Sequence, residues 1–142
     1  MGGIDYARKL TSFTQVIELM KLPISEAEAQ VMEVLWQQSP RATDEIAAAL
    51  AGQQDWQLAT IKTLVNRLLN KGAIAAEKDG RRYLYRPLLR REDWVGSQSI
   101  GLLDRLFGGQ LAPLVAQFSS QRKLSAADRA ALKKLLEDDG DA

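Results

Sequence analysis

The apolar and polar positions in the first half of the chain are spaced with helical periodicity. Ser25 and Glu28 form a capping box, which predicts that a first helix begins after Ser25 and continues to about Gln38. The apolar residues that share its inward face are Ala27, Val31, Val34 and Leu35. A second short helix is predicted to extend to Leu50, with Thr43 as its N-terminal cap.

The third predicted helix, over residues 57–71, has two faces of different character. Gly72 follows it and is suited to the positive φ that ends many helices. At about 100° per residue, one sector holds the aliphatic residues Ile61, Leu64, Val65, Leu68 and Leu69. The opposite sector holds the polar residues Thr63, Asn66, Arg67 and Asn70. The aliphatic face is therefore expected to pack inward, and the polar face is expected to be available for hydrogen bonding.

Two short extended segments, residues 73–76 and 82–86, follow the third helix. The 77–81 connection contains Asp79-Gly80, a strong hairpin-turn signal, and Pro87 closes the second strand. Three helices followed by a basic hairpin is the element order of a winged helix. In that fold the third helix enters the major groove of DNA and the hairpin lies along the adjacent backbone.

The second half of the chain predicts a helical arm. Its helices are expected over residues 91–107, 111–118 and 126–137, with a break at Gly108-Gly109 and a capping box of Ser125 and Asp128. About 50 residues of extended helices cannot bury their own apolar side chains, so a partner chain is expected to cover them. The residues assigned to this dimer interface are Trp94, Leu103, Phe107, Leu111, Leu114, Val115, Phe118, Leu132 and Leu135.

The predicted fold is therefore mainly α, with an N-terminal winged helix-turn-helix and a helical C-terminal dimerisation arm. Residues 1–19 are interpreted as an extension or disordered start, and residues 20–89 as the DNA-binding domain. Residues 90–138 are interpreted as the dimerisation domain, and residues 139–142 as an acidic tail.

Composition narrows the classes of function. The 142 residues, 46% of them hydrophobic, suit one core with a smaller appendage. The chain has no His and no Cys, which excludes disulfides, thiolate metal sites and catalysis by Ser-His-Asp or Cys-His groups. No cofactor or metal is expected, and no enzymatic constellation is present. No apolar run approaches the roughly 18 residues of a membrane span, so we expect a cytoplasmic protein without membrane insertion.

The net charge of +1 conceals a strong asymmetry along the chain. Between Met20 and Trp56 two basic residues stand against six acidic ones, a local net charge of −4. Between Gln57 and Arg91 nine basic residues stand against two acidic ones, a local net charge of +7. This second stretch predicts an anion-binding surface, and ordinary solvated surface charge is the alternative interpretation.

Several short motifs together resemble the penicillinase-repressor family of bacterial regulators, the BlaI/MecI/CopY group, over residues 24–138. They are Ile24-Ser-Glu-Ala-Glu28, Val31-Met-Glu-Val-Leu-Trp36, Trp56, Thr60-Ile-Lys-Thr-Leu-Val-Asn-Arg67, Lys71-Gly72, Leu106-Phe-Gly-Gly109 and Leu124-Ser-Ala-Ala-Asp128. Each motif alone is weak evidence for the family, but the combination of motifs is specific to it.

The resemblance implies a homodimer on an inverted-repeat DNA operator, with base-facing residues at Thr60, Thr63 and Arg67 and backbone contacts at Lys62 and in the wing. The helical wheel independently places a similar face outward. Arg67 suits bidentate recognition of guanine, and Thr63 suits contact with a base or a methyl group. The predicted DNA-binding residues are Thr60, Lys62, Thr63, Asn66 and Arg67 on the helix, with Lys78, Arg81 and Arg82 gripping phosphate from the wing.

Two departures from the family pattern concern induction. CopY-type relatives sense copper through C-terminal cysteines, which this chain lacks. Antibiotic-responsive relatives are cut at an Asn-Phe bond, which aligns with Gln117-Phe118 here. Cleavage at this bond by a sensor-linked protease is therefore a hypothesis.

Other readings of the same residues stay open. A winged-helix module that binds protein rather than an operator is the main alternative function. Trp36, Trp56 and Trp94 are interpreted as packing residues rather than as a stacking platform or ligand pocket.

Overall fold

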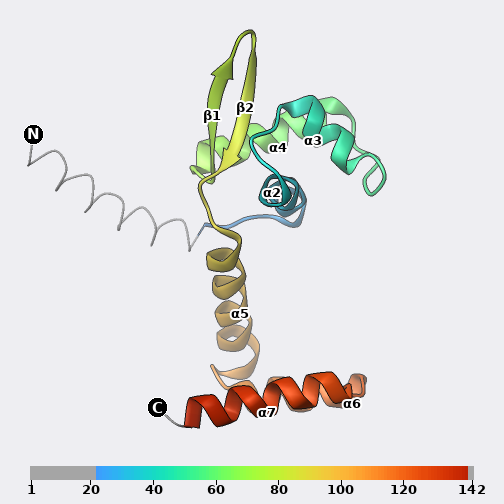
Figure 1. Ribbon diagram of the computed structural model, residues 1–142, viewed down its shortest axis with the longest axis vertical. Helices are drawn as coiled ribbons and strands as arrows, with labels where there is room; N and C mark the ends of the chain where they lie inside the picture. The colour runs from blue at the N-terminus through green and yellow to red at the C-terminus, as the bar shows by residue number, and fades with distance from the viewer. Residues whose placement is uncertain (1–21, 141–142) are drawn as a thin grey trace, which may run out of the picture. The chain divides into compact units, whose positions relative to one another are not determined.

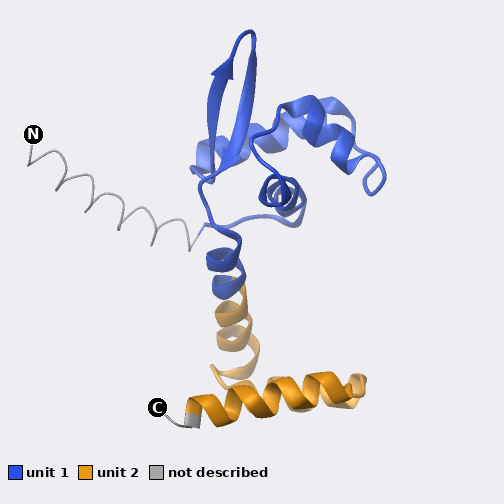
Figure 2. Cartoon of the chain, viewed as in Figure 1, with its two compact units in different colours: residues 1–97 blue, residues 98–142 orange. Residues whose placement is uncertain are grey.

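The computed structural model of the chain describes residues 22–140. The predicted extension at residues 1–19 and the last two residues of the predicted acidic tail lie outside this range. The chain divides between Ser97 and Gln98 into two compact units (Figure 2). The domain limits predicted at residues 89 and 138 stay a prediction.

The first unit is a winged helix, as predicted. Its helices are α2 (Glu26–Gln37), α3 (Thr43–Leu50) and α4 (Leu58–Lys71), followed by strands β1 (Ile74–Asp79) and β2 (Arg82–Pro87) (Figure 1). The three helices pack against one another, β1 contacts α4, and β2 contacts α2 and α3. The core that they enclose consists of Val31, Met32, Val34, Leu35, Ile46, Leu50, Ile61, Leu64, Val65, Leu68, Ala73, Ile74 and Leu89.

The starts of the first two helices are set by carboxylates that reach back to a backbone amide. At α2 the predicted capping box is confirmed, because the Glu28 amide donates to Ser25 Oγ at 3.1 Å and the Ser25 amide donates to Glu28 Oε1 at 3.1 Å. At α3 the predicted cap was wrong. Ala42 is the N-cap and Thr43 is the first helical residue. The Glu45 carboxylate accepts from the Ala42 amide at 2.9 Å, so the capping interaction comes from inside the helix.

The hairpin is longer than predicted. The sequence pattern left residues 77–81 as a connection, but Glu77, Lys78 and Asp79 continue β1 and pair with β2. Only Gly80 and Arg81 form the loop, because the positive φ of Gly80 (65°) lets the chain reverse within two residues.

The base of the hairpin is joined to the loop between α2 and α3. The amide of Arg41 donates to the carbonyl of Tyr85 at 3.0 Å, and the amide of Tyr85 donates to the carbonyl of Arg41 at 2.8 Å. This isolated antiparallel bridge adds a third short segment beside β2, so the base of the wing is anchored to the helical core.

A longer helix, α5 (Arg91–Phe107), crosses the division between the two units. It is followed by α6 (Leu111–Gln121) and α7 (Ala126–Gly140). The predicted break is confirmed, because Gly108 and Gly109 have φ of 58° and 79°. Both later helices are longer than predicted, and α7 includes the residues 138–140 that the sequence pattern placed beyond its end. None of residues 98–139 is buried.

Among residues 22–140, no helix combines the length and the apolar character that a membrane crossing requires.

Candidate nucleic-acid interface

Helix α4 presents a polar outward face, as its periodicity predicted. Its inward residues Ile61, Leu64, Val65 and Leu68 are buried. Its exposed polar residues are Thr60, Lys62, Thr63, Asn66, Arg67 and Asn70. The helix is long enough for four turns and ends at Gly72, whose φ is 79°.

The Thr63 hydroxyl donates its hydrogen bond within the helix. Its Oγ1 donates to the carbonyl of Ala59 at 3.0 Å, one turn earlier in the helix. The lone pairs of the oxygen and the Cγ methyl group remain available on the exposed face. Thr63 can therefore accept a hydrogen bond or contact a thymine methyl group, but it does so in an orientation held by the helix backbone.

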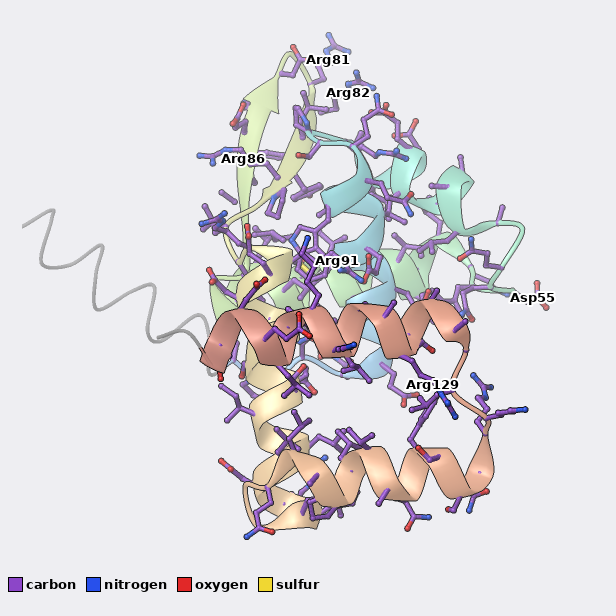
Figure 3. The ribbon with its side chains drawn as sticks, turned by 60° about the horizontal axis from the view of Figure 1, so that its bottom comes forward. Asp55, Arg81, Arg82, Arg86, Arg91 and Arg129 are labelled. Atoms are coloured by element: carbon purple, nitrogen blue, oxygen red, sulfur yellow. The ribbon has the colours of Figure 1, made fainter. Side chains whose placement is uncertain are left out.

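The tip of the wing carries Arg81 and Arg82, and Arg86 lies nearer its base (Figure 3). Arg82 lies between two carboxylates, with Nη1 3.8 Å from Glu45 Oε1 and Nε 3.8 Å from Asp79 Oδ2. Arg86 Nε donates to Glu77 Oε1 on the paired strand at 2.7 Å. Both arginines therefore have acidic neighbours within the first unit.

The nine basic residues of the positively charged stretch divide into paired and unpaired groups. The paired ones are Lys71 with Glu28, Arg82 with Glu45 and Asp79, Arg86 with Glu77, Arg90 with Glu92, and Arg91 with Glu33. Within the described range, Lys62, Arg67, Lys78 and Arg81 form no such ion pair. These four exposed cations, two on α4 and two on the hairpin, have charges that an external anion can neutralise.

A hollow of about 390 Å³ lies where the start of α3, the start of α4 and the wing meet. Its lining residues are Ala42, Thr43, Asp44, Leu58, Lys62, Arg81, Arg82, Tyr83 and Tyr85, and we call it the wing hollow. Three of the predicted DNA-binding residues, Lys62, Arg81 and Arg82, are brought together there. Lys78 and the α4 residues Thr60, Thr63, Asn66 and Arg67 do not line it.

Leu58 and Tyr83 also line the wing hollow, and neither was predicted from the sequence as a site residue. Both are large hydrophobic residues with substantial exposure, 45% for Leu58 and 52% for Tyr83. An aromatic residue directly after two arginines in a hairpin strand was a signal that could have identified Tyr83. Leu58 carried no such signal, because an aliphatic residue at the start of a helix is usually a packing residue.

The end of α4 is attached to the start of α2 by a partly buried ion pair. Lys71 Nζ lies 2.7 Å from each carboxylate oxygen of Glu28, and it also donates to the carbonyl of Pro23 at 2.6 Å. Burial by itself raises the pKa of the Glu28 carboxyl. The hydrogen bonds from Lys71 and Ser25 lower the pKa by more than burial raises it, so the pKa lies below the ordinary value of 4.5. The pair helps to set the position of α4 against the core.

The three tryptophans pack, as their interpretation expected. Trp36 and Trp94 have ring centroids 5.6 Å apart, and the Trp36 indole N–H donates to the carbonyl of Leu89 at 2.8 Å. Trp56 also packs against the core of the first unit. The ring of Trp94 thus has a packing contact within this unit, but its indole N–H has no hydrogen-bond partner in the described range. Its predicted part in a dimer interface stays a prediction.

Five of the predicted dimer residues line one apolar groove of about 370 Å³ between α6 and α7. They are Leu114, Val115, Phe118, Leu132 and Leu135. Leu111 is 54% exposed, while Leu103 and Phe107 are half-buried on α5. Gln117 and Phe118, the predicted cleavage position, are exposed and lie inside α6.

Comparison with curated proteins finds relatives that match most of this chain. A penicillinase repressor of Bacillus licheniformis is 34% identical over 121 residues, covering 84% of this chain and 94% of the relative. The methicillin resistance regulatory protein MecI of Staphylococcus aureus (strain N315) is 30% identical over 113 residues, covering 80% of this chain and 92% of the relative.

Two solved structures of the repressor BlaI are similar to parts of this chain. The DNA-binding domain of BlaI is 38% identical, with a TM-score of 0.46, and the match covers 49% of this chain and 85% of that chain. The monomeric form of Bacillus licheniformis BlaI in complex with the blaP half-operator is also 38% identical, with a TM-score of 0.45, covering 51% and 88%.

A model of the penicillinase repressor family matches residues 24–138, which include the winged helix and nearly all of the arm. Together with relatives that align over four-fifths of its length, this match shows that the chain belongs to the penicillinase repressor family.

Proposed function

We propose that this protein is a transcriptional repressor that binds an inverted-repeat DNA operator as a homodimer. The observation that carries the proposal is the polar outward face of α4 together with four cations that form no ion pair in the described range, Lys62 and Arg67 on α4 and Lys78 and Arg81 on the hairpin. Membership of a repressor family supports the same function. The protein acts by binding rather than by catalysis.

Within this function, α4 reads base edges and the wing contacts phosphates. Arg67 donates two hydrogen bonds to guanine, and Thr63 contacts a base through its methyl group or its oxygen. Asn66 lies on the same outward face, and Thr60 and Lys62 flank it toward the DNA backbone. Lys78 and Arg81 neutralise phosphates, which adds affinity that depends on salt but not on sequence.

Dimerisation is supported by the apolar surface of the second unit. Leu106, Leu135 and Leu136 are each more than 60% exposed, and no described residue of α6 is buried. A second copy of the chain covers such a surface and places two α4 helices on two half-sites. Linked half-sites raise the overall affinity by orders of magnitude over one half-site alone.

Derepression by a sensor-linked protease at Gln117-Phe118 is a further part of the proposal. A protease needs an extended substrate, and this bond lies within a helix. Because no residue of α6 is buried within the described chain, its local unfolding is expected to be inexpensive in a subunit whose contact with the partner has opened. Mass spectrometry of the full chain after incubation with the partnered protease should find fragments ending at Gln117. A chain that stays intact would remove this mode of induction.

The repressor function is tested by fluorescence anisotropy on family-like inverted repeats and on scrambled duplexes, over about 50 to 300 mM salt. The expected result is tight binding by a dimer that prefers the repeat and weakens steeply with salt, with light scattering giving the mass. Absence of binding to any duplex at low salt would overturn the proposal in favour of a protein-interaction module.

A further inference from the structure

Exposed apolar residues and cations of the first unit gather at the wing hollow. Among residues 22–97, the large hydrophobic residues with substantial exposure are Leu58, Tyr83 and Val95, and the first two line the hollow. Lys62 and Arg81, which form no ion pair in the described range, line the same hollow. A ligand that fills it must therefore offer an apolar surface and a negative charge close together.

The sugar-phosphate backbone of DNA has this combination within a single nucleotide. The carbon face of deoxyribose is apolar, and the adjoining phosphate is anionic. We infer that the wing hollow holds a segment of the operator backbone, with deoxyribose against Leu58 and Tyr83 and the phosphate facing Lys62 and Arg81. This inference rests on the proposed function, and it assigns to Leu58 and Tyr83 a part in DNA binding.

The position of the hollow on α4 favours DNA over an acidic peptide. Lys62 lines the hollow and is followed directly by Thr63 on the outward face of the helix. A strand seated in the hollow therefore runs along the edge of the groove that α4 enters. An isolated peptide site would not need this continuity with the outward face of α4.

The other charged residues of the hollow have separate effects. Arg82 is drawn toward Glu45 and Asp79, and Glu45 also accepts from the Ala42 amide at the start of α3. Arg82 is therefore a positioning residue that ties the wing tip to α3. Asp44 lines the hollow and opposes an incoming phosphate. Replacing this carboxylate by an amide, Asp44→Asn, is expected to tighten binding to every duplex.

The test compares Leu58→Ala and Tyr83→Ala with Val95→Ala, which shortens an exposed residue outside the hollow. Each hollow variant should bind operator and scrambled duplex about three- to tenfold more weakly, because it loses apolar contact with the backbone. The salt slope should not change, because no phosphate contact is lost. Lys62→Ala should instead lower the slope by about one. Val95→Ala should bind like the wild type.

A second measurement locates the phosphate. Duplexes that carry one neutral methylphosphonate at successive positions should bind the wild type less well at one position per half-site. Lys62→Ala should bind the duplex with the methylphosphonate at that position as well as it binds the unmodified duplex. At other positions the methylphosphonate should affect Lys62→Ala as it affects the wild type.

The outcomes separate this inference from the proposed function. A wild type that binds no duplex contradicts the repressor function itself. A wild type that binds the operator while Leu58→Ala and Tyr83→Ala match Val95→Ala overturns the backbone assignment alone. Weakening of the operator complex without weakening of the scrambled complex also overturns it, since contacts with the backbone do not distinguish sequences. Thermal unfolding of each variant controls for a loss of fold.

Discussion

At single positions, the basic residues around α4 and the wing differ in whether an acidic partner lies within reach. Arg86 and Arg91 lie close to Glu77 and Glu33, whereas Arg67 and Arg81 have no carboxylate partner in the described range. Sequence alone could not separate these groups, because a pair such as Arg91 with Glu33 joins residues 58 positions apart. Replacing one of the arginines without an acidic partner should consequently lower the affinity of the protein for DNA.

Arg67→Ala and Arg81→Ala should therefore weaken binding in different ways. Loss of a base contact by Arg67→Ala should cost about 1–3 kcal/mol on the operator and relax its sequence preference. Loss of a phosphate contact by Arg81→Ala should weaken operator and scrambled duplex alike and reduce the salt slope by about one. Anisotropy titrations at several salt concentrations measure both quantities. Equal losses by both variants on both duplexes would contradict this division of roles.

Glu28 links residue chemistry to stability. Its side chain is 3% exposed, and its pKa is lowered, so the folded state binds the proton less readily than the unfolded state. The stabilising effect is therefore fully present above the ordinary carboxyl pKa and is lost as the pH falls through the lowered value. The Glu28–Lys71 pair should then make the fold sensitive to acid.

Replacing this carboxylate by an amide, Glu28→Gln, should lower the free energy of unfolding by about 1–3 kcal/mol at neutral pH. The difference from the wild type should shrink as the pH falls from the ordinary carboxyl pKa of 4.5 through the lowered pKa of Glu28, because the wild-type carboxyl then becomes neutral, as the amide already is. Denaturant unfolding at several pH values measures this difference in the free energy of unfolding. Glu33→Gln is the matched control, since Glu33 pairs with Arg91 at the surface and should change stability little. A difference that persisted unchanged in acid would exclude the ion pair as its source.

At the scale of elements, the local signals predicted most of the secondary structure. The helix starting after Ser25, the helix of residues 91–107 and the glycine breaks were all identified from residues within one turn of each other. The predicted boundaries were wrong where a helix cap or a strand end depends on an interaction other than the one that the local pattern indicated. The Glu45 carboxylate replaced the expected Thr43 cap, and cross-strand pairing extended β1 through residues that looked like a loop.

Gly72 is the element boundary with the clearest physical requirement. It has a φ of 79°, and its amide donates to the last turn of α4 before β1 begins. A Cβ at this position would meet no heavy atom within 4 Å, so the cost of a side chain is conformational. The left-handed backbone, rather than lack of space, makes glycine preferable here.

Gly72→Ala is expected to destabilise the first unit by about 1–2 kcal/mol. Gly52→Ala is the matched control, because a Cβ there also meets nothing within 4 Å and its φ is not in the left-handed region. The control should be neutral or slightly stabilising. Thermal unfolding compares the two, and equal effects would show that backbone strain is not the cause.

At the scale of the whole molecule, the two units differ in how they are stabilised. Every buried hydrophobic residue of the described chain lies between Val31 and Leu89, so the winged helix has its own core. Residues 98–139 have none, although their helices carry many apolar side chains. The second unit is therefore expected to depend on a partner for its stability, whereas the first is not.

Leu114→Asp, which puts a charge into the groove between α6 and α7, should give a monomer with an intact winged helix. Ala116→Asp adds the same charge to the same helix outside the groove and should leave the dimer unchanged. Light scattering gives the mass, and circular dichroism reports the helical content that remains. A dimer that survived Leu114→Asp would show that this groove is not the interface.

The sequence by itself determined the order of the helices and the two strands, which face of α4 points inward, and the family to which the chain is similar. These features depend on periodicity and capping between residues a few positions apart, so they can be read from the chain locally. Only the tertiary structure decided that Glu28 holds Lys71, that Arg82 faces Glu45, and that Leu58 and Tyr83 meet at the wing hollow. Such contacts depend on how distant elements pack, and no local pattern specifies which carboxylate or apolar side chain a folded chain will bring to a given cation.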